Sequence, residues 1–185
     1  MWRTGFGRGK GQTVTGRADI RQGAAAGCRC CAVDTSRPVR RVLSPGTRAT
    51  AVAVAGTLAA LGGLHAVWSR SPWPCRDRDR FADLVVGVAP EQLPSAQACL
   101  GVAGLLGTAA YLVAARGGAL PAIGPRRLRT TGTATVAGVL LTRALAGPLA
   151  FAHRTPAFVH LDRRLYAPLC LALGTGAAVV AARGK

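Results

Sequence analysis

The chain has few acidic and few aromatic residues. Of its 185 residues, only 7 are Asp or Glu, 5% are aromatic and one is Met. None of the acids falls inside its long apolar runs, which argues against a proton-coupled carrier, because such carriers use carboxylates within the membrane. The chain also lacks paired carboxylates, a nucleophile beside a base, and a phosphate-binding loop. These absences predict that the protein is not an enzyme.

The apolar runs themselves lack interleaved polar residues. They cover residues 49–68, 95–115, 132–151 and 165–182, and a soluble helix or strand of such length would carry polar residues at its own period. About 20 helical residues cross a hydrocarbon core of about 30 Å. Backbone groups in lipid must be satisfied within the segment, which favours helices. The sequence therefore predicts an all-α integral membrane protein, a four-helix bundle whose first partner is the lipid bilayer.

The basic residues behind the net charge of +17 lie almost entirely outside the apolar runs. Residues 1–48 hold 10 of the 24 basic residues and have no apolar period, so we expect a disordered basic tail followed by a four-span domain, 49–185. With both termini in the cytoplasm, the inner segments hold 16 basic residues and the outer loops 7. This bias is the usual topology signal. It predicts a multi-pass protein of the cell membrane and no nucleic-acid partner.

The tail contains two motifs with alternative interpretations. Arg40 and Arg41 resemble a twin-arginine signal, but the apolar run that follows is too long for a cleaved leader and three more runs come after it. A C-x-C-C cluster provides three thiols, one fewer than the four ligands of structural zinc. We therefore interpret the tail as an extension without a metal site. The clustered thiols are Cys28, Cys30 and Cys31.

Small residues recur at a spacing of four in each run, and such stripes let membrane helices approach closely. They predict the contact faces of the four helices. The stripes are Ala55, Ala59 and Gly63; Ala103 and Gly107; Ala134, Gly138, Thr142 and Ala146; and Gly174, Ala178 and Ala182. In the connection between the first two runs, residues 81–88 are expected to form a short interfacial helix, with Trp68 and Trp73 at headgroup level.

Arg143 is the only charged residue inside a run. A central arginine costs about 2.5 to 3.5 kcal/mol on insertion scales, so the third span should depend on its neighbours. Its candidate partners are Asp162 at the outer boundary, carbonyls freed near Pro148, or a bound anion such as a lipid phosphate. A functional role and a structural role, in which the side chain snorkels or caps backbone, both remain open. Asp162 itself is expected to cap the last helix.

Several polar residues gather at the predicted outer side. We take six of them as a candidate ligand-binding or structural cluster: His65, Trp68, Arg143, Asp162, Arg164 and Tyr166. Three cysteines on the same side, Cys75, Cys99 and Cys170, are candidates for a disulfide, and the sequence does not choose between the pairings. No cofactor is expected, although imidazoles at His65, His153 and His160 leave a haem or metal site as an alternative.

The start of the last run resembles a family motif. Leu161, Asp162, Arg164, Leu165, Tyr166, Pro168, Leu169 and Cys170 match a pattern like L-D-x-R-L-Y-S-P-L-C, with Ala167 in the place of serine. This string is similar to the signature of domain-of-unknown-function family 3995, a bacterial family of small four-span membrane proteins. Leu64, His65 and Trp68 resemble its L-H-x-x-W pattern, and Arg143-Ala144 its third-span arginine. Ser69 and Arg70 replace a glycine pair. The resemblance implies the fold and topology, and no activity.

Three functions are consistent with these observations. We favour a non-enzymatic membrane protein whose outer face binds a lipid headgroup, an anion or a partner helix, the partner being a second copy or another membrane protein. The first alternative is a redox, haem or metal-binding membrane protein that uses the outer histidines and cysteines. The second is a subunit of a small transporter, which would need to dimerise.

Overall fold

The structure, a computed structural model, describes residues 44–184. Within this range the chain forms helices and no strand. Four helical segments are long and apolar enough to cross a membrane: α1 (Pro45–Trp68), α3 (Ala96–Arg116), α4 (Arg126–Ala150) and the segment Pro156–Arg183. The prediction of an all-α membrane four-helix bundle is confirmed for this range, and the four segments indicate a multi-pass membrane protein. The expected disorder of the tail and its cysteine cluster lie outside the described residues.

The last segment is a continuous helix made of three parts: α5 (Pro156–Leu161), the π-helical turn η3 (Asp162–Tyr166) and α6 (Ala167–Arg183). It starts before residue 165, where the last apolar run begins. Thr155 caps its first turn by accepting from the Phe158 N–H at 3.4 Å. Asp162 is therefore inside the helix, and the expectation that Asp162 caps it is wrong.

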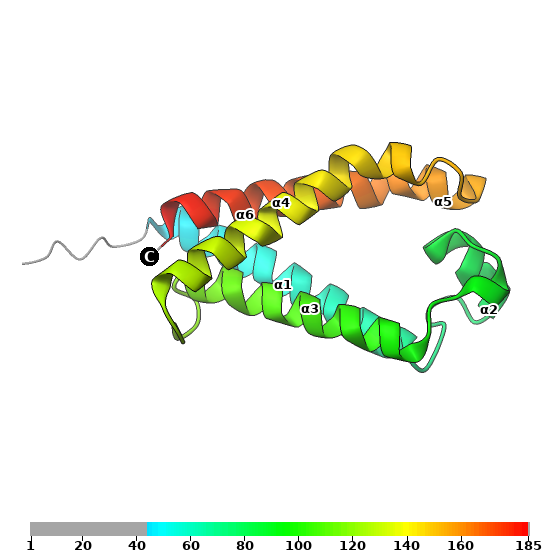
Figure 1. Ribbon diagram of the computed structural model, residues 1–185, viewed down its shortest axis with the longest axis horizontal. Coiled ribbons are helices and arrows are strands. Elements are labelled where there is room, and N and C mark those ends of the chain that lie inside the picture. Colours follow the sequence, from blue (N-terminus) through cyan, green and yellow to red (C-terminus); the bar gives the residue numbers. More distant parts are fainter. Residues whose placement is uncertain (1–43, 185) are drawn as a thin grey trace, which may run out of the picture. The chain divides into compact units, whose positions relative to one another are not determined.

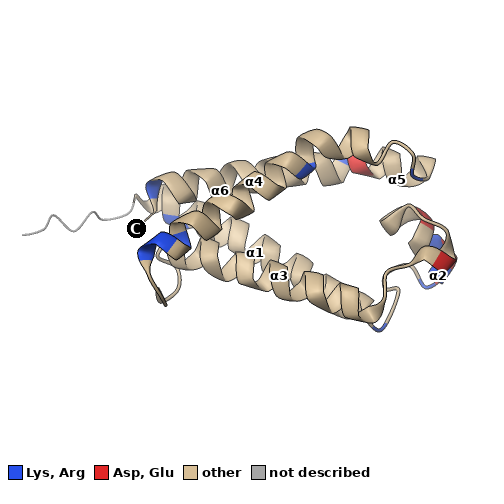
Figure 2. Cartoon of the chain, viewed as in Figure 1, with Lys and Arg blue, Asp and Glu red and all other residues tan. Residues whose placement is uncertain are grey.

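The long helices pack against their sequence neighbours. The main contacts join α1 to α3 and α4 to α6, and smaller contacts join α3 to α4 and α1 to α6. Figure 1 shows the two pairs meeting near the C-terminus and separating toward α2 and α5. We call the end with the starts of α1 and α4 the basic end, and the opposite end the aromatic end. Figure 2 shows acidic residues only toward the aromatic end of the described chain.

Most of the helical surface is apolar and exposed. At most 28% of each membrane-spanning window is buried inside the protein. Leu149 is 81% exposed, Leu105 72% and Leu145 71%. Water-soluble proteins rarely expose large contiguous apolar patches, so this surface indicates lipid contact. The exposed face is thus the outside of a membrane bundle.

The buried core lies in the half of the bundle toward the basic end. It is built mainly from alanine and valine, so the helix backbones can approach closely. Val113, Ala177 and Val180 are fully buried in this core. Its other members are Ala51, Val54, Ala55, Leu58, Ala110, Ala114, Ala137 and Leu173.

The predicted contact stripes are only partly right. On α4 the whole predicted stripe is exposed, and the buried residues are Thr133, Ala137, Ala144 and Gly147. On α1 the glycine in contact with α3 is Gly62, not Gly63. Steps of four residues drift by about 40° each around a helix of 3.6 residues per turn, so a stripe at constant spacing of four leaves the contact face.

The connection from α1 to α3 contains α2 (Arg78–Phe81), η1 (Ala82–Val86) and the short turn η2 (Pro90–Gln92). This helical stretch covers residues 78–86, slightly earlier than the expected 81–88. Gly87 ends it with φ of 71° and packs directly against Phe158 of α5. Thr155 Oγ1 also donates to the Asp83 carbonyl at 2.8 Å. The connection thereby links the two helix pairs at the aromatic end.

The packing makes a direct prediction for two glycines. A Cβ on Gly174 would lie 2.9 Å from Leu141 Cγ and 3.0 Å from the Leu141 backbone nitrogen, whereas a Cβ on Gly138 would meet nothing within 4 Å. Gly174→Leu should therefore destabilise the α4–α6 pair by about 1–3 kcal/mol, the usual effect of overpacking. Thermal unfolding in detergent measures the change. Gly138→Leu is the matched control, and equal losses in the two variants would contradict this packing.

Candidate functional site

Arg143 and Asp162 form an ion pair between α4 and η3. Arg143 Nη2 donates to Asp162 Oδ1. The Asp162 side chain is 1% exposed and that of Arg143 27%. Of the partners considered for Arg143, the structure selects Asp162, and it places this acid inside the last membrane-spanning helix. This position precedes the apolar run that begins at residue 165, so the run itself contains no acid.

Gly147 makes room for the guanidinium. A Cβ at this position would lie 1.9 Å from Arg143 Nη1, so only glycine fits there without moving the arginine. The Arg143 Cζ then lies 4.5 Å from the centre of the Phe151 ring, a distance suited to a cation–π contact. Arg143, Gly147 and Phe151 are spaced by four residues and share a helix face. This pattern was visible in the sequence, and our sequence reasoning missed it.

Asp162 is the first residue of the π-helical turn η3. A π turn inserts an extra residue into the helix and shifts the register of the side chains that follow. The helix α4 meanwhile continues through Pro148 to Ala150, so the expected break at that proline does not occur. Asp162 Oδ2 and Arg143 Nη1 are buried and make no hydrogen bond within residues 44–184.

The other members of the predicted cluster lie in separate groups. His65 Nδ1 donates to the Leu61 carbonyl at 2.9 Å, and its ring lies 4.8 Å from Trp68, which in turn contacts Phe81 at 5.3 Å. Tyr166 contacts Phe158 at 5.9 Å. Five of the six residues thus form an ion pair and two aromatic groups rather than one pocket. His65 and Trp68 come from α1, whereas Tyr166 lies in η3 with Asp162.

Arg164 belongs to a different feature, a basic pocket of about 430 Å³ at the aromatic end. Arg154, His160, Arg163 and Arg164 supply all of its charged and titratable groups. His160 lies three and four residues before the last two arginines, a spacing that places side chains on one helix face. We call these four residues the basic pocket. Sequence reasoning placed Arg164 in another cluster and considered His160 only as a haem or metal ligand, although the spacing was readable.

Arg154 is the most constrained member of the basic pocket. Its Nε is buried and makes no hydrogen bond within the described chain, and its Cζ lies 5.7 Å from the Phe151 ring centre. The same ring therefore contacts both Arg143 and Arg154. Phe151 connects the ion pair to the basic pocket.

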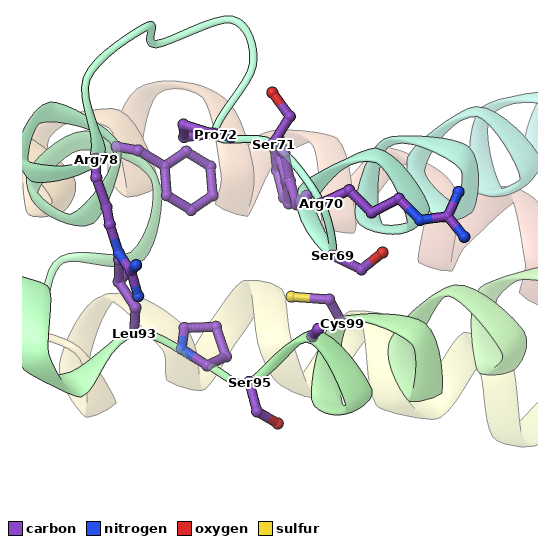
Figure 3. Close-up of a pocket in the computed structure, with 12 residues that line it drawn as sticks. Ser69, Arg70, Ser71, Pro72, Arg78, Leu93, Ser95 and Cys99 are labelled. Carbon is purple, nitrogen blue, oxygen red and sulfur yellow. The ribbon is translucent and has the colours of Figure 1, made fainter.

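The cysteines are separate from this pocket. Cys75, Cys99 and Cys170 are free thiols in the structure. Figure 3 shows the sulfur of Cys99 pointing into another pocket, of about 300 Å³, which Arg78 also lines. Within residues 44–184, no three His, Cys, Asp or Glu side chains come close enough to hold a metal ion. His153 and His160 line different pockets.

The ion pair predicts an asymmetry between single and double variants. Arg143→Met leaves a buried carboxylate without its partner and should destabilise the protein by about 3–5 kcal/mol. The double variant Arg143→Met/Asp162→Leu removes both charges and should recover most of that loss, because apolar replacements of buried pairs are often neutral. Thermal unfolding in detergent tests this. Additive losses in the double variant would exclude a coupled pair.

The role of Gly147 can be tested without touching a charge. Gly147→Ala should displace the guanidinium and lower the unfolding temperature, but by less than Arg143→Met does, because the added methyl group meets only the flexible end of the Arg143 side chain. Gly138→Ala, on the exposed face of the same helix, should leave the unfolding temperature unchanged or raise it slightly, because alanine favours the helix more than glycine does. A neutral effect at both positions would contradict the described path of the arginine.

Comparison with known proteins agrees with the resemblance found in the sequence. Residues 58–177 match the family model described as Protein of unknown function (DUF3995). No curated protein and no solved structure matches the chain. The matched region contains Arg143, Gly147 and Asp162, together with the whole basic pocket. The chain therefore belongs to the DUF3995 family of proteins of unknown function.

Proposed function

We propose that this protein is a non-enzymatic membrane protein that binds a phosphate-bearing lipid headgroup in the basic pocket. The observation that carries the proposal is the charge of the pocket, which has three arginines, one histidine and no acidic residue in its lining. Guanidinium groups bind phosphate oxygens through paired, charge-assisted hydrogen bonds. The volume of about 430 Å³ is in the usual range for small-ligand pockets.

The nearest acid in the sequence does not neutralise this pocket. Asp162 lies between His160 and Arg163 in the chain, but it is buried and paired with Arg143. The acidic side chain is therefore withdrawn from the surface on which the basic residues lie. Arg163 and Arg164 remain exposed, so their charge is available to an anion.

The depth of the pocket in a bilayer also suits a headgroup. The last membrane-spanning segment has 28 residues, which at about 1.5 Å per residue exceeds a hydrocarbon core of about 30 Å. Its end at Arg183 lies at the basic end of the bundle, so its first residues extend beyond the core at the aromatic end. His160, Arg163 and Arg164 then lie among the headgroups, next to Phe158 and Tyr166, which suit the interface.

We further propose that the basic end faces the cytoplasm and that the membrane is the cell membrane. The support is the basic tail, whose arginines precede α1 and follow the usual bias of cytoplasmic segments. In this orientation the basic pocket would lie in the outer leaflet. A scan of single-cysteine labelling from each side of intact cells tests the orientation independently of lipid binding.

Binding can be measured on the full chain in a neutral detergent. Titration with phosphatidylglycerol should raise its unfolding temperature, and native mass spectrometry should detect retained lipid. Arg163→Gln/Arg164→Gln should weaken the apparent affinity of this lipid about tenfold, because charge-assisted hydrogen bonds to phosphate are lost.

The matched control is Arg78→Gln/Arg80→Gln, which removes the same charge from exposed positions at the same end. These arginines alternate with Asp77 and Asp79, so their charge is already balanced and lipid binding should be unchanged. Equal weakening in the two double variants would reduce the effect to net charge and exclude a specific pocket. Phosphatidylcholine serves as the lipid without net charge.

A further inference from the structure

The start of α4 is an uncapped helix N-terminus surrounded by arginine. No side chain caps it, and its first turn contains no acid. The preceding residue is Pro125, whose side chain offers no hydrogen-bond acceptor. The N–H groups of the first turn have no carbonyl partner within a helix, and the helix dipole places partial positive charge there. Arg126, Arg127 and Arg129 add three full charges to this end.

Arg116, the last residue of α3, supplies a second and independent observation. Its side chain is buried, with the residue only 4% exposed. Nη2 donates to the Ala181 carbonyl of α6 at 2.9 Å, but Nε and Nη1 are buried and make no hydrogen bond within residues 44–184. Burying a charged group without partners for its donors is costly. Only one of the three guanidinium nitrogens of Arg116 therefore makes a hydrogen bond within residues 44–184.

The charges around Arg116 are all of the same sign. Thr133 Oγ1 of α4 donates to the Leu112 carbonyl of α3 at 3.3 Å, so Arg129, one turn before Thr133, lies beside Arg116, one turn after Leu112. Arg129 also has a buried Nε without a hydrogen-bond partner within residues 44–184. The described acids lie at the aromatic end: Asp77, Asp79, Asp83, Glu91 and Asp162. No carboxylate in the described chain can thus balance this group of arginines, in contrast to the pair formed by Arg143.

We propose that the basic end holds a second anion site, which takes a phosphate group between the N-terminus of α4 and the guanidinium of Arg116. Free N–H groups at a helix start are a ready site for phosphate. Arg116 Nε and Nη1 would donate to the same anion, and Arg126 and Arg129 would supply its remaining contacts. The three arginines come from two helices, so a bound phosphate would also join α3 to α4.

The phosphate can belong to a lipid headgroup or to a free anion. The helix α4 has 25 residues, and at about 1.5 Å per residue it is longer than a hydrocarbon core of about 30 Å. Its first turn precedes the apolar run that begins at residue 132 and is therefore at headgroup depth. This position makes a lipid phosphate accessible, while the site chemistry is the same for inorganic phosphate.

The test uses the purified full chain in neutral detergent with two probes, phosphatidylglycerol and inorganic phosphate. Arg126→Gln/Arg129→Gln should weaken the binding of the effective probe about tenfold, measured from the rise in unfolding temperature and from retained ligand in native mass spectrometry. A response to the lipid alone identifies a headgroup site, and a response to both probes identifies a site for free phosphate. Unchanged binding of both probes in this variant would overturn the proposal.

The variant Arg163→Gln/Arg164→Gln at the other end is the matched control, since it removes the same charge. Each double variant should weaken binding at its own end of the bundle and leave the other end unchanged. Failure of this proposal and failure of the proposed function therefore give different results. Arg116→Lys provides a milder change that keeps the charge but removes the planar fork of donors. It should weaken binding severalfold, and unaltered affinity would exclude Arg116 from the site.

Discussion

A charged side chain in the middle of an apolar helix is costly unless a partner of opposite charge is buried with it. Arg143 and Asp162 supply this partnership between α4 and the last helix. Arg143 alone would make α4 harder to insert, and its pairing with Asp162 fixes the register of two helices. Gly147 leaves the space that the guanidinium of this pair occupies, and Asp162 is the first residue of the π-helical turn.

The two ends of the bundle solve different packing problems. Toward the basic end, alanine, valine and glycine bring the helices into close contact, and the core lies there. Toward the aromatic end, the pairs are joined through larger groups: the ion pair within one pair, and Phe158 against Gly87 between the pairs. Polar and aromatic contacts therefore replace close backbone contact where the two helix pairs separate. The basic pocket also lies at this end.

Much of the fold was readable from composition, because lipid leaves a long apolar segment few options besides a helix. The site was readable only in part. Asp162 was among the partners considered for Arg143, but the choice depended on how α4 and the last helix pack, which no residue pattern shows. Gly147 and Phe151 were missed, although their spacing from Arg143 indicates a shared face. His160, Arg163 and Arg164 were likewise on one face.

The sequence by itself determined that the described chain is helical, that four segments can cross a membrane, and which residues are charged. It could not determine which face of each helix is buried, because small residues are frequent on every face and a stripe at constant spacing rotates away from the contact. Tertiary structure decided those faces, since backbone approach depends on two helices at once. It also decided that Asp162 turns inward while the arginines beside it turn outward, because only a neighbouring helix provides the charge that makes burial of a carboxylate favourable.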